Sequence, residues 1–268
     1  MPERCAVRVA VFFSLVVAGC AQTPSVGEAT PSRTPEAAVT SSIRSMTEVL
    51  RMDFEPPAPL RVRGGASLEA EAVSLNGANL MTVPSWESGL AVRFPAASRD
   101  AEPPGLMILI AGPGLPNPGP RAFAYGADVR LDPVSVSDAD DGDNILQRGL
   151  ASDSRQFKLQ VDAGRPSCVV EGTSGRVTAK AKQRLEDGWY RLRCERSGDD
   201  LVLTVIELED DGSTAITTTT MPAGDVTFPA GTPLSIGRKS TAAGEPVINK
   251  PDQFNGALDN VWISVADA

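Results

Sequence analysis

The stretch between residues 144 and 206 contains five short apolar segments: NILQRG (144–149), QFKLQVD (156–162), PSCVVEG (166–172), DGWYRLRCER (187–196) and DLVLTVI (200–206). The connecting segments are rich in Gly, Ser and Asp, the residues that favour turns. Alternating or continuous apolar runs of this length, punctuated by turns, are typical of antiparallel strands that follow one another in a sheet. This stretch therefore predicts a β-sheet and decides the fold class.

The remainder of the carboxyl-terminal part continues this pattern. Residues 106–111 are apolar at every position, which predicts a central strand covered on both faces, and residues 123–131 alternate like a half-buried strand. No long amphipathic helical pattern is present. An all-β, two-sheet antiparallel sandwich is therefore expected, with the closing strand beside an early one.

The first twenty residues have the pattern of an export signal. Arg4 and Arg8 precede a short apolar run at 9–18, which ends in small residues and Cys20. The run is too short for a bilayer, which needs roughly 20 apolar residues. Its ending resembles the lipobox of bacterial lipoproteins, and this resemblance implies that Cys20 is lipidated after cleavage before it. An ordinary secretory signal is the alternative.

Three segments follow from these patterns. We expect a lipoprotein signal peptide at 1–19, a lipidated Cys20 with a flexible tether at 20–49, and one β-domain at 50–268. The tether is assigned by its Ala, Thr, Ser, Pro and Glu content and its lack of apolar periodicity. The expected location is outside the cytoplasm, with the membrane as a partner through the N-terminal lipid.

Composition excludes several classes of function. The 268 residues contain no histidine, so neither a Ser-His-Asp nor a Cys-His nucleophile pair nor a His-ligated zinc site can form. The formal charge is −9 and no basic stripe is clustered in the sequence. An acidic chain of this kind disfavours nucleic acid as a partner.

Four sequence elements resemble the laminin-G-like, or concanavalin A-like lectin/glucanase, jelly-roll family. They are residues 144–149 with 157–162, residues 185–192, residues 233–237, and the closing pattern Phe254-x-Gly-x-Leu-Asp-x-Val-x-Ile263. Tyr190 stands where the family usually has histidine. The resemblance implies a jelly-roll sandwich, but function only loosely, because such domains serve as lectins, adhesive modules and accessory parts of enzymes.

Cys168 and Cys194 are the only cysteines left after the signal peptide and Cys20 are set aside. Each lies on an expected strand, and export to an oxidising compartment favours a disulfide between them. The alternative is a pair of buried free thiols.

An acidic segment precedes the deciding stretch. Asp138, Asp140, Asp143 and Asn144 offer the hard oxygen ligands that Ca²⁺ prefers, and some laminin-G-like domains hold calcium at the sandwich rim. The spacing is not that of an EF-hand loop. A Ca²⁺ site and a solvated acidic loop are both compatible with this segment, and no other cofactor is expected.

Two tryptophans are candidates for stacking on a sugar ring. Trp86 falls in a loop, and Trp262 points away from the core if Val261 and Ile263 face inward. Incidental packing is the alternative for both. Trp189 is expected to pack in or beside the core, as its equivalent in the family does.

No catalytic residues are predicted. Glucanases of this superfamily carry Glu-x-Asp-x-x-Glu on one strand, whereas the nearest match here, residues 207–211, lacks that spacing. Arg191, Arg193 and Arg196 are expected on an exposed strand face with cross-strand ion pairs.

The hypothesis that follows is a membrane-anchored extracytoplasmic binding module that recognises a glycan or a protein at the cell envelope. A purely structural or assembly role in the envelope is the first alternative, and a glycoside hydrolase-like enzyme is the second.

Overall fold

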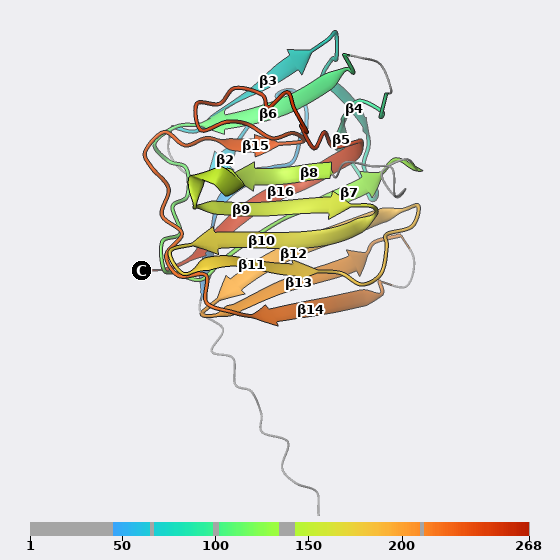
Figure 1. Cartoon of the computed structure of the whole chain (residues 1–268). Coiled ribbons are helices and arrows are strands. Elements are labelled where there is room, and N and C mark those ends of the chain that lie inside the picture. Colours follow the sequence, from blue (N-terminus) through green and yellow to red (C-terminus); the bar gives the residue numbers. More distant parts are fainter. Residues whose placement is uncertain (1–44, 65–66, 99–101, 134–142, 210–211, 268) are drawn as a thin grey trace, which may run out of the picture. The chain divides into compact units, whose positions relative to one another are not determined.

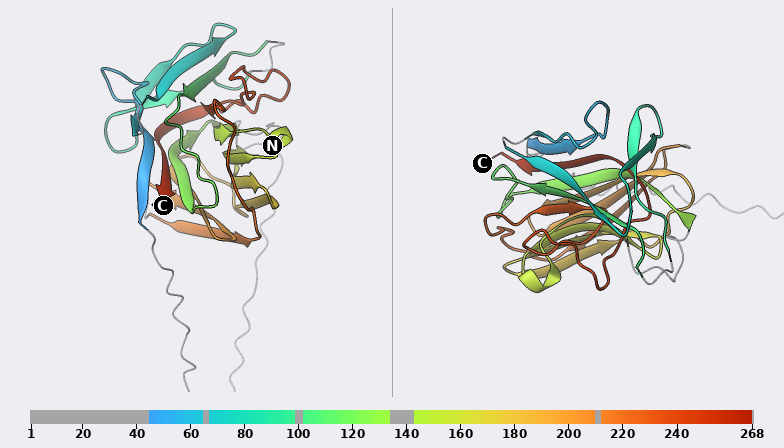
Figure 2. Two further views of the ribbon diagram at one scale, coloured as in Figure 1. Left: turned by 90° about the vertical axis from the view of Figure 1, so that its left-hand side faces the viewer. Right: turned by 90° about the horizontal axis from the view of Figure 1, so that it is seen from above.

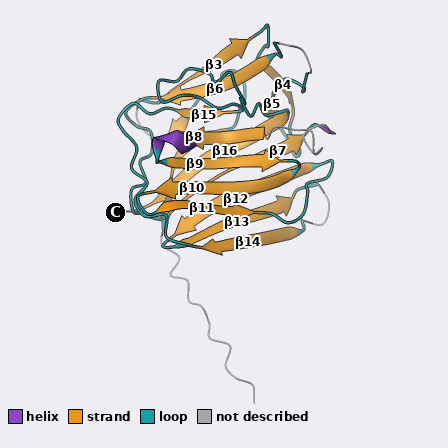
Figure 3. Cartoon of the chain, in the orientation of Figure 1, coloured by secondary structure: helices purple, strands orange, loops and turns teal. Residues whose placement is uncertain are grey.

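The structure of the chain, a computed structural model, describes residues 45–64, 67–98, 102–133, 143–209 and 212–267. These residues form two antiparallel sheets that pack face to face (Figure 1). The described residues contain very little helix, and the one helical element that lies wholly among them is the 3₁₀ turn η2 (Ala151–Asp153), purple in Figure 3. None of the described helical structure has the length and apolarity needed to cross a bilayer.

The first sheet has seven strands. In spatial order they are β11 (Gly175–Lys180), β10 (Arg165–Gly172), β9 (Gln156–Asp162), β8 (Asp143–Arg148), β15 (Leu234–Ile236), β6 (Gly105–Ala111) and β3 (Glu69–Leu75). Four of them follow one another in the chain as hairpins or near-hairpins, in agreement with the pattern of the deciding stretch.

The second sheet has nine strands. Its main path is β14 (Thr214–Thr220), β13 (Asp200–Glu207), β12 (Trp189–Ser197), β7 (Phe123–Leu131), β16 (Gly256–Ala266), β1 (Met46–Met52) and β2 (Arg63–Gly64). A hairpin of β4 (Met81–Pro84) and β5 (Leu90–Arg93) joins it through β5.

The closing strand β16 organises the second sheet. It pairs with β7 on one side; on its other side it pairs first with β5, at residues 257 and 258, and then with β1 from Val261 onward. Figure 2 shows β1 and β16 side by side. The register of β16 shifts between Asp259 and Trp262, where Asn260 has a φ of +48°. The partner strand of β16 therefore changes from β5 to β1 at a β-bulge.

The inner faces of both sheets supply one hydrophobic core. Its aromatic centre brings Phe123 and Tyr125 of the nine-stranded sheet against Phe157 of the seven-stranded sheet, with ring centroids 5.0 to 5.7 Å apart. All three side chains are fully buried. Aromatic pairs at such distances add to the stabilisation that burial alone provides.

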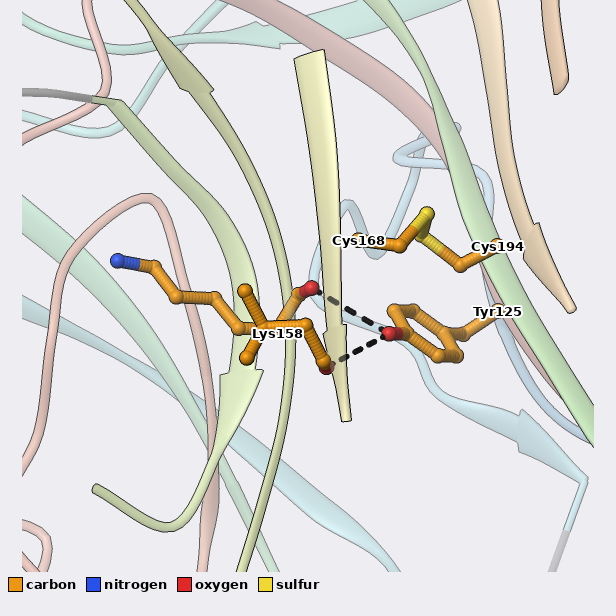
Figure 4. Close-up of a disulfide and its surroundings, with 5 residues drawn as sticks. Tyr125, Lys158, Cys168 and Cys194 are labelled. Carbon is orange, nitrogen blue, oxygen red and sulfur yellow. Dashed lines mark hydrogen bonds between the residues drawn. A yellow bond between two sulfur atoms is a disulfide. The ribbon is translucent and has the colours of Figure 1, made fainter. Parts of the chain in front are cut away.

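A disulfide between Cys168 of β10 and Cys194 of β12 joins the two sheets, with their Cα atoms 5.7 Å apart (Figure 4). Beside it, the Tyr125 hydroxyl lies 3.1 Å from the Val169 carbonyl oxygen and 3.3 Å from that of Lys158, and it donates to them across the core. The predicted cysteine pairing is therefore present. In the chain-entropy account, closing a loop of this length stabilises the fold by about 3–4 kcal/mol.

The two-sheet sandwich and the position of the closing strand beside an early one agree with the expectations. Strand β1 begins at Met46, four residues before the expected start of the domain. The apolar strand β6 is, as predicted, an internal strand: it lies between β15 and β3 and is buried along almost its whole length. The prediction for Arg196 was wrong. Arg196 is buried, because its guanidinium donates to the carbonyl groups of Gly119, Arg121 and Gly224.

Candidate binding cleft on the nine-stranded sheet

The outward-facing side chains of β12 and β7 form the floor of the candidate site. Leu192 and Cys194 point into the core, so the two-residue period of a strand sends Trp189, Arg191 and Arg193 to the outer face. Their partners in the β7 register are Arg130, Asp128 and Gly126. Charged and aromatic residues thus lie next to each other across these two strands.

A cleft of about 540 Å³ opens at one end of this outer face. Its walls come from the β4–β5 hairpin, the end of β7 and the segment that leads into β12. The side chains that line it include Trp86, Trp189, Arg93, Arg130, Asp132 and Asp187. A concave site with aromatic and charged groups converging on it is the usual form of a small-ligand site.

The two indoles of the cleft differ in their surroundings. Trp189 is only 2% exposed and packs on Ala91 and Ala257, two small residues that leave room for its ring above the sheet. Trp86 and Val83 are partly buried and pack against this small cluster. Trp189 is therefore a fixed part of the floor, whereas Trp86 stands at the solvent side.

Two arginine–carboxylate pairs flank the indoles. Arg93 donates to Asp132 at 2.7 Å, and Arg130 lies 3.4 Å from Asp187, with Glu209 also in the lining. Both arginines and Asp187 retain much of their contact with solvent. The Arg130–Asp187 pair is exposed and contributes little to stability, so its polar groups are free to re-pair with a ligand, whereas the Arg93–Asp132 pair is partly buried.

The hairpin that carries Trp86 is tied to the sheet at two points. The Ser85 hydroxyl donates to the Asp259 carboxylate at 2.6 Å, and the Leu90 amide donates to the Glu55 carboxylate at 3.0 Å. These bonds lie on either side of the 85–89 turn. They hold the indole of Trp86 over the end of β16 and limit the motion of the cleft wall.

A buried polar network lies beneath the hairpin. Arg191 donates twice to Asp128, at 2.7 and 2.8 Å, and the Asn260 amide group donates to the same carboxylate at 3.0 Å. The backbone amide of Asn260 donates to Asp259 at 2.6 Å. The two carboxylates face each other in the β7–β16 register and are almost fully buried. Such charges are tolerated only with this density of partners.

Asp259 is the titratable group of this network. Burial raises the pKa of its carboxyl from 3.8 to about 6, and the nearby negative charges of Asp128 and Glu55 act in the same direction. The hydrogen bonds from Ser85 and from the Asn260 amide oppose this shift without cancelling it. The anchor of the Trp86 hairpin therefore changes its protonation state near pH 6.

The paired carboxylates Asp128 and Asp259 do not form a hydrolytic dyad. A glycosidase needs two carboxyl groups that both face the substrate across a cleft. Here Asp128 is bound by Arg191 and Asn260, Asp259 is bound by Ser85, and both lie under the hairpin. They position the cleft wall and do not line the cleft.

Of the two tryptophans predicted to stack on a ligand, the structure places Trp86 in the cleft and Trp262 elsewhere on the same outer face. Trp262 lies over Gly126, where a side chain on Gly126 would meet its ring. The Arg193 guanidinium lies 5.3 Å from its centroid, at cation–π distance. Val261 and Ile263 are buried, so Trp262 points outward as expected.

The predicted Ca²⁺ ligands are only partly described. Asp138 and Asp140 lie outside the described residues, and Asp143 and Asn144 are fully buried at the start of β8. Asp143 accepts a hydrogen bond from the Asn255 amide at 2.8 Å and so joins β8 to the segment before β16. In the described part of the chain, no group of three or more acidic or cysteine side chains is arranged to hold a metal.

Residues of the cleft and of the network beside it were missed by the sequence reading. Arg130 and Asp128 alternate with apolar residues on β7, which indicates an outer face, but nothing local to them or to Asp259 shows that a distant hairpin contacts this face. Trp189 was expected in or beside the core; it is buried beside it, in a separate cluster on the outer face. Polar residues at alternate positions of three strands predict which face of the sheet is the outer one. They do not predict that a cleft forms on that face.

Comparisons with known proteins agree with this architecture. Residues 145–265, a little under half of the chain, match the family model described as the laminin G domain. No curated protein matches the sequence.

Solved structures with a similar fold include two binding domains and a bacteriophage tailspike protein. The binding domain of Paraclostridial Mosquitocidal Protein 1 has a TM-score of 0.55 and 11% identity over 82% of this chain and 49% of its own. The binding domain of botulinum neurotoxin serotype D has a TM-score of 0.54 and 9% identity, with the same coverage. Tailspike protein 2 of an Escherichia coli O157:H7 bacteriophage has a TM-score of 0.50 and 12% identity over 85% and 27%. The chain thus spans less than half the length of these proteins, and the likeness is one of fold.

The raised pKa of Asp259 predicts a pH-dependent stability. Because the folded chain binds this proton more tightly than the unfolded chain, the stabilisation is complete below about pH 4 and is lost as pH rises through about 6. We expect the free energy of unfolding of the wild type, relative to that of Asp259→Asn, to fall between these values. Urea unfolding of both proteins across this range measures it.

The matched control is Asp187→Asn, which removes a carboxylate of the same cleft that is 82% exposed. This variant should keep the pH profile of the wild type. A difference between the wild type and Asp259→Asn that stays constant with pH would contradict the assignment of the shifted carboxyl to Asp259.

Proposed function

We propose that this protein is a non-catalytic binding module that recognises a glycan in the cleft between Trp86 and Trp189. The observation that carries the proposal is the convergence of two indoles and two arginine–carboxylate pairs on a concave surface. The match of residues 145–265 to the laminin G domain model and the jelly-roll fold support a binding role.

The chemistry of the cleft suits a saccharide. Indole faces pack against the apolar faces of sugar rings, and large rigid side chains lose little conformational entropy when they bind. Guanidinium and carboxylate groups such as those of Arg93 and Asp132 can donate to and accept from vicinal hydroxyls, and charged partners make hydrogen bonds about twice as strong as neutral ones. Because Trp189 is already held in place by its packing, ligand binding has less side-chain conformational entropy to remove.

A binding role without catalysis is favoured by the state of the carboxylates. The chain has no histidine, so acid–base chemistry would depend on Asp, Glu, Lys or Tyr. The one carboxyl of the site whose pKa rises to about 6, that of Asp259, is bound to Ser85 beneath the hairpin and does not line the cleft. Asp259 therefore does not supply a proton to a ligand in the cleft.

The proposed location is the outer side of the cell membrane, with the protein attached through a lipid on Cys20. The support is the sequence before Cys20, whose basic start, short apolar run and small residues are those of a lipoprotein signal. Roughly 25 residues separate Cys20 from β1, and a flexible tether of that length reaches about 30 Å. The β-domain would then stand clear of the lipid headgroups.

A second candidate function is the recognition of an envelope protein through Trp262. The specific observation is the cation–π contact of Trp262 with Arg193 on the outer face, since Trp and Arg are the residues most often dominant in protein interfaces. This surface lies apart from the residues that line the cleft.

The cleft is tested by Trp86→Ala on a glycan array that carries neutral and acidic oligosaccharides. We expect the wild type to bind a subset of the glycans and the variant to bind them about tenfold more weakly, because one stacking surface is lost. Titration calorimetry with the strongest array ligand gives the ratio of dissociation constants.

Trp262→Ala is the matched control, since it removes an indole from the same face outside the cleft. It should bind the glycan like the wild type. Failure of the wild type to bind any glycan would contradict the proposal, and so would a loss caused by Trp262→Ala and not by Trp86→Ala, which would favour the second candidate.

Anchoring is tested by Cys20→Ala, which removes the thiol that would carry the lipid. We expect the variant to move from the membrane fraction to the soluble fraction, because each buried CH₂ of an acyl chain contributes about 0.8 kcal/mol to membrane binding. Fractionation followed by immunoblotting measures the distribution. A variant that still sediments with the membrane would contradict lipid anchoring at Cys20.

A further inference from the structure

The outer face of the seven-stranded sheet carries a second hollow, distinct from the Trp86–Trp189 cleft. Its floor is a row of residues paired across four strands: Gln147 on β8, Lys158 on β9, Val169 on β10 and Thr178 on β11. A second row places Gln160, Ser167 and Lys180 next to one another. These rows cross the strands at a spacing of roughly 4.8 Å per strand, so the polar floor extends about 14 Å.

The hollow is a groove of about 620 Å³. One wall is the 150–152 turn, and another comes from the segment between β15 and β16, which contributes Lys239 and Lys250. Figure 4 shows the side chain of Lys158 directed away from Tyr125 and the disulfide, to the outer side of the sheet. The groove floor therefore includes β9 and β10, the two strands whose carbonyl groups accept hydrogen bonds from the Tyr125 hydroxyl.

Two buried polar atoms in the groove have no hydrogen-bond partner among the described residues. Ser167 is 1% exposed and its hydroxyl is unpartnered; Gln147 is 2% exposed, and its amide oxygen is unpartnered while its amide nitrogen donates to Gly149. A buried polar group without a partner is rare in folded proteins, because it loses its bonds to water without replacing them. Both residues line the groove, where a ligand would supply the missing partners.

The groove also carries an excess of positive charge in an otherwise acidic chain. The ammonium groups of Lys158 and Lys239 share one carboxylate, that of Asp252, each at 2.7 Å. Lys158 is almost fully buried, and burial lowers the pKa of its ammonium group despite the opposing effect of Asp252. The single charge of Asp252 neutralises one of the two lysines, and a bound anion would neutralise the other.

Two further cations border the groove and are accessible. Arg176 pairs with Glu171 at 2.6 Å and Lys180 pairs with Asp162 at 2.6 Å, and both cationic side chains are more than 40% exposed. Exposed pairs exchange partners at little expense. Lys180 can therefore turn to a ligand and leave Asp162 in contact with solvent, whereas the partner of Arg176, Glu171, is only 18% exposed.

We propose that this groove binds a linear anionic polysaccharide, with its carboxylate or sulfate groups at the cations and its hydroxyls at Ser167 and Gln147. The site is independent of the proposed function of the Trp86–Trp189 cleft. It combines cationic groups for the anion with a hydroxyl and an amide oxygen that match the hydroxyls of a sugar.

An acidic peptide fits the groove less well. The backbone N–H and C=O groups of β8, β9 and β10 are already used by the neighbouring strands, and those of the edge strand β11 pair with β10 on one side. A peptide laid on this face would find no backbone partners for its own amides, whose burial without bonds is unfavourable. Polysaccharides such as alginate and dextran sulfate have no amides to satisfy, and their hydroxyls can pair with side chains.

The experiment measures binding of the full-length protein to dextran sulfate and to alginate, with unsubstituted dextran as the neutral polymer, by affinity electrophoresis at physiological salt. We expect retardation by at least one anionic polymer and none by dextran; the comparison of sulfate with uronate identifies the anion. Arg176→Ala combined with Lys180→Ala should weaken binding about tenfold.

Ser167→Ala separates a ligand site from a structural one. The replacement removes a hydroxyl that has no partner in the fold, so the melting temperature should stay the same or rise while binding weakens about threefold. Arg61→Ala removes an exposed cation outside the groove and should change binding less than twofold. Trp86→Ala should also leave binding to these polymers unchanged, so that failure of one site is distinguishable from failure of the other.

Three results would overturn the proposal. The first is no retardation by either anionic polymer. The second is a loss of binding in Arg61→Ala as large as that in the Arg176→Ala, Lys180→Ala double variant. That result would show a general attraction between charges and not a site. The third is binding of poly-glutamate as tight as that of the anionic polysaccharides, which would assign the groove to acidic peptides.

Discussion

The face-to-face packing of the two sheets is the constraint on which the other features depend. Phe123 and Tyr125 from one sheet meet Phe157 from the other, and the Cys168–Cys194 disulfide crosses the same interface. Because side chains on a strand alternate, each residue committed to this core fixes its neighbours on the outer face. The outer positions of β7, β9, β10 and β12 are therefore available for polar and aromatic groups held on rigid elements.

The two outer faces differ in chemistry because different segments cover them. On the nine-stranded sheet, the β4–β5 hairpin pairs through β5 with the start of β16, and it forms one wall of a cleft with two indoles and paired arginines and acids. On the seven-stranded sheet, the segment after β15 borders a groove with lysines and two unpartnered polar atoms. One sandwich thus supports an aromatic cleft and a cationic groove, and each is held by strands that the core fixes in place.

Local pattern was enough to predict the layers and some of the site. Alternation in residues 187–196 places Cys194 on the same face as Leu192, and the pairing with Cys168 was predicted from the count of cysteines and the expected export. The closing motif likewise predicted that Trp262 points outward. These predictions succeeded because they depend on the two-residue period of a strand, which neighbouring residues determine.

The cleft and the groove could not be predicted because they depend on register between distant segments. Ser85 binds Asp259 across 174 positions of the chain, and this contact, together with the pairing of β5 with β16, brings Trp86 next to Trp189. Arg196 was misplaced for a local reason: alternation puts it on the same face of β12 as Leu192 and Cys194, where carbonyl groups accept hydrogen bonds from its guanidinium and bury it. A single sequence does not specify which loop covers which face.

The central claim is that this fold presents a preformed ligand surface at Trp86 and Trp189. It is tested most directly by the indole N–H signals of the three tryptophans in a ¹H–¹⁵N spectrum, recorded while the strongest array glycan is added. The account predicts that the signals of Trp86 and Trp189 shift together with one dissociation constant while that of Trp262 stays in place. Saturation with the glycan while the Trp86 and Trp189 signals remain unchanged would contradict it.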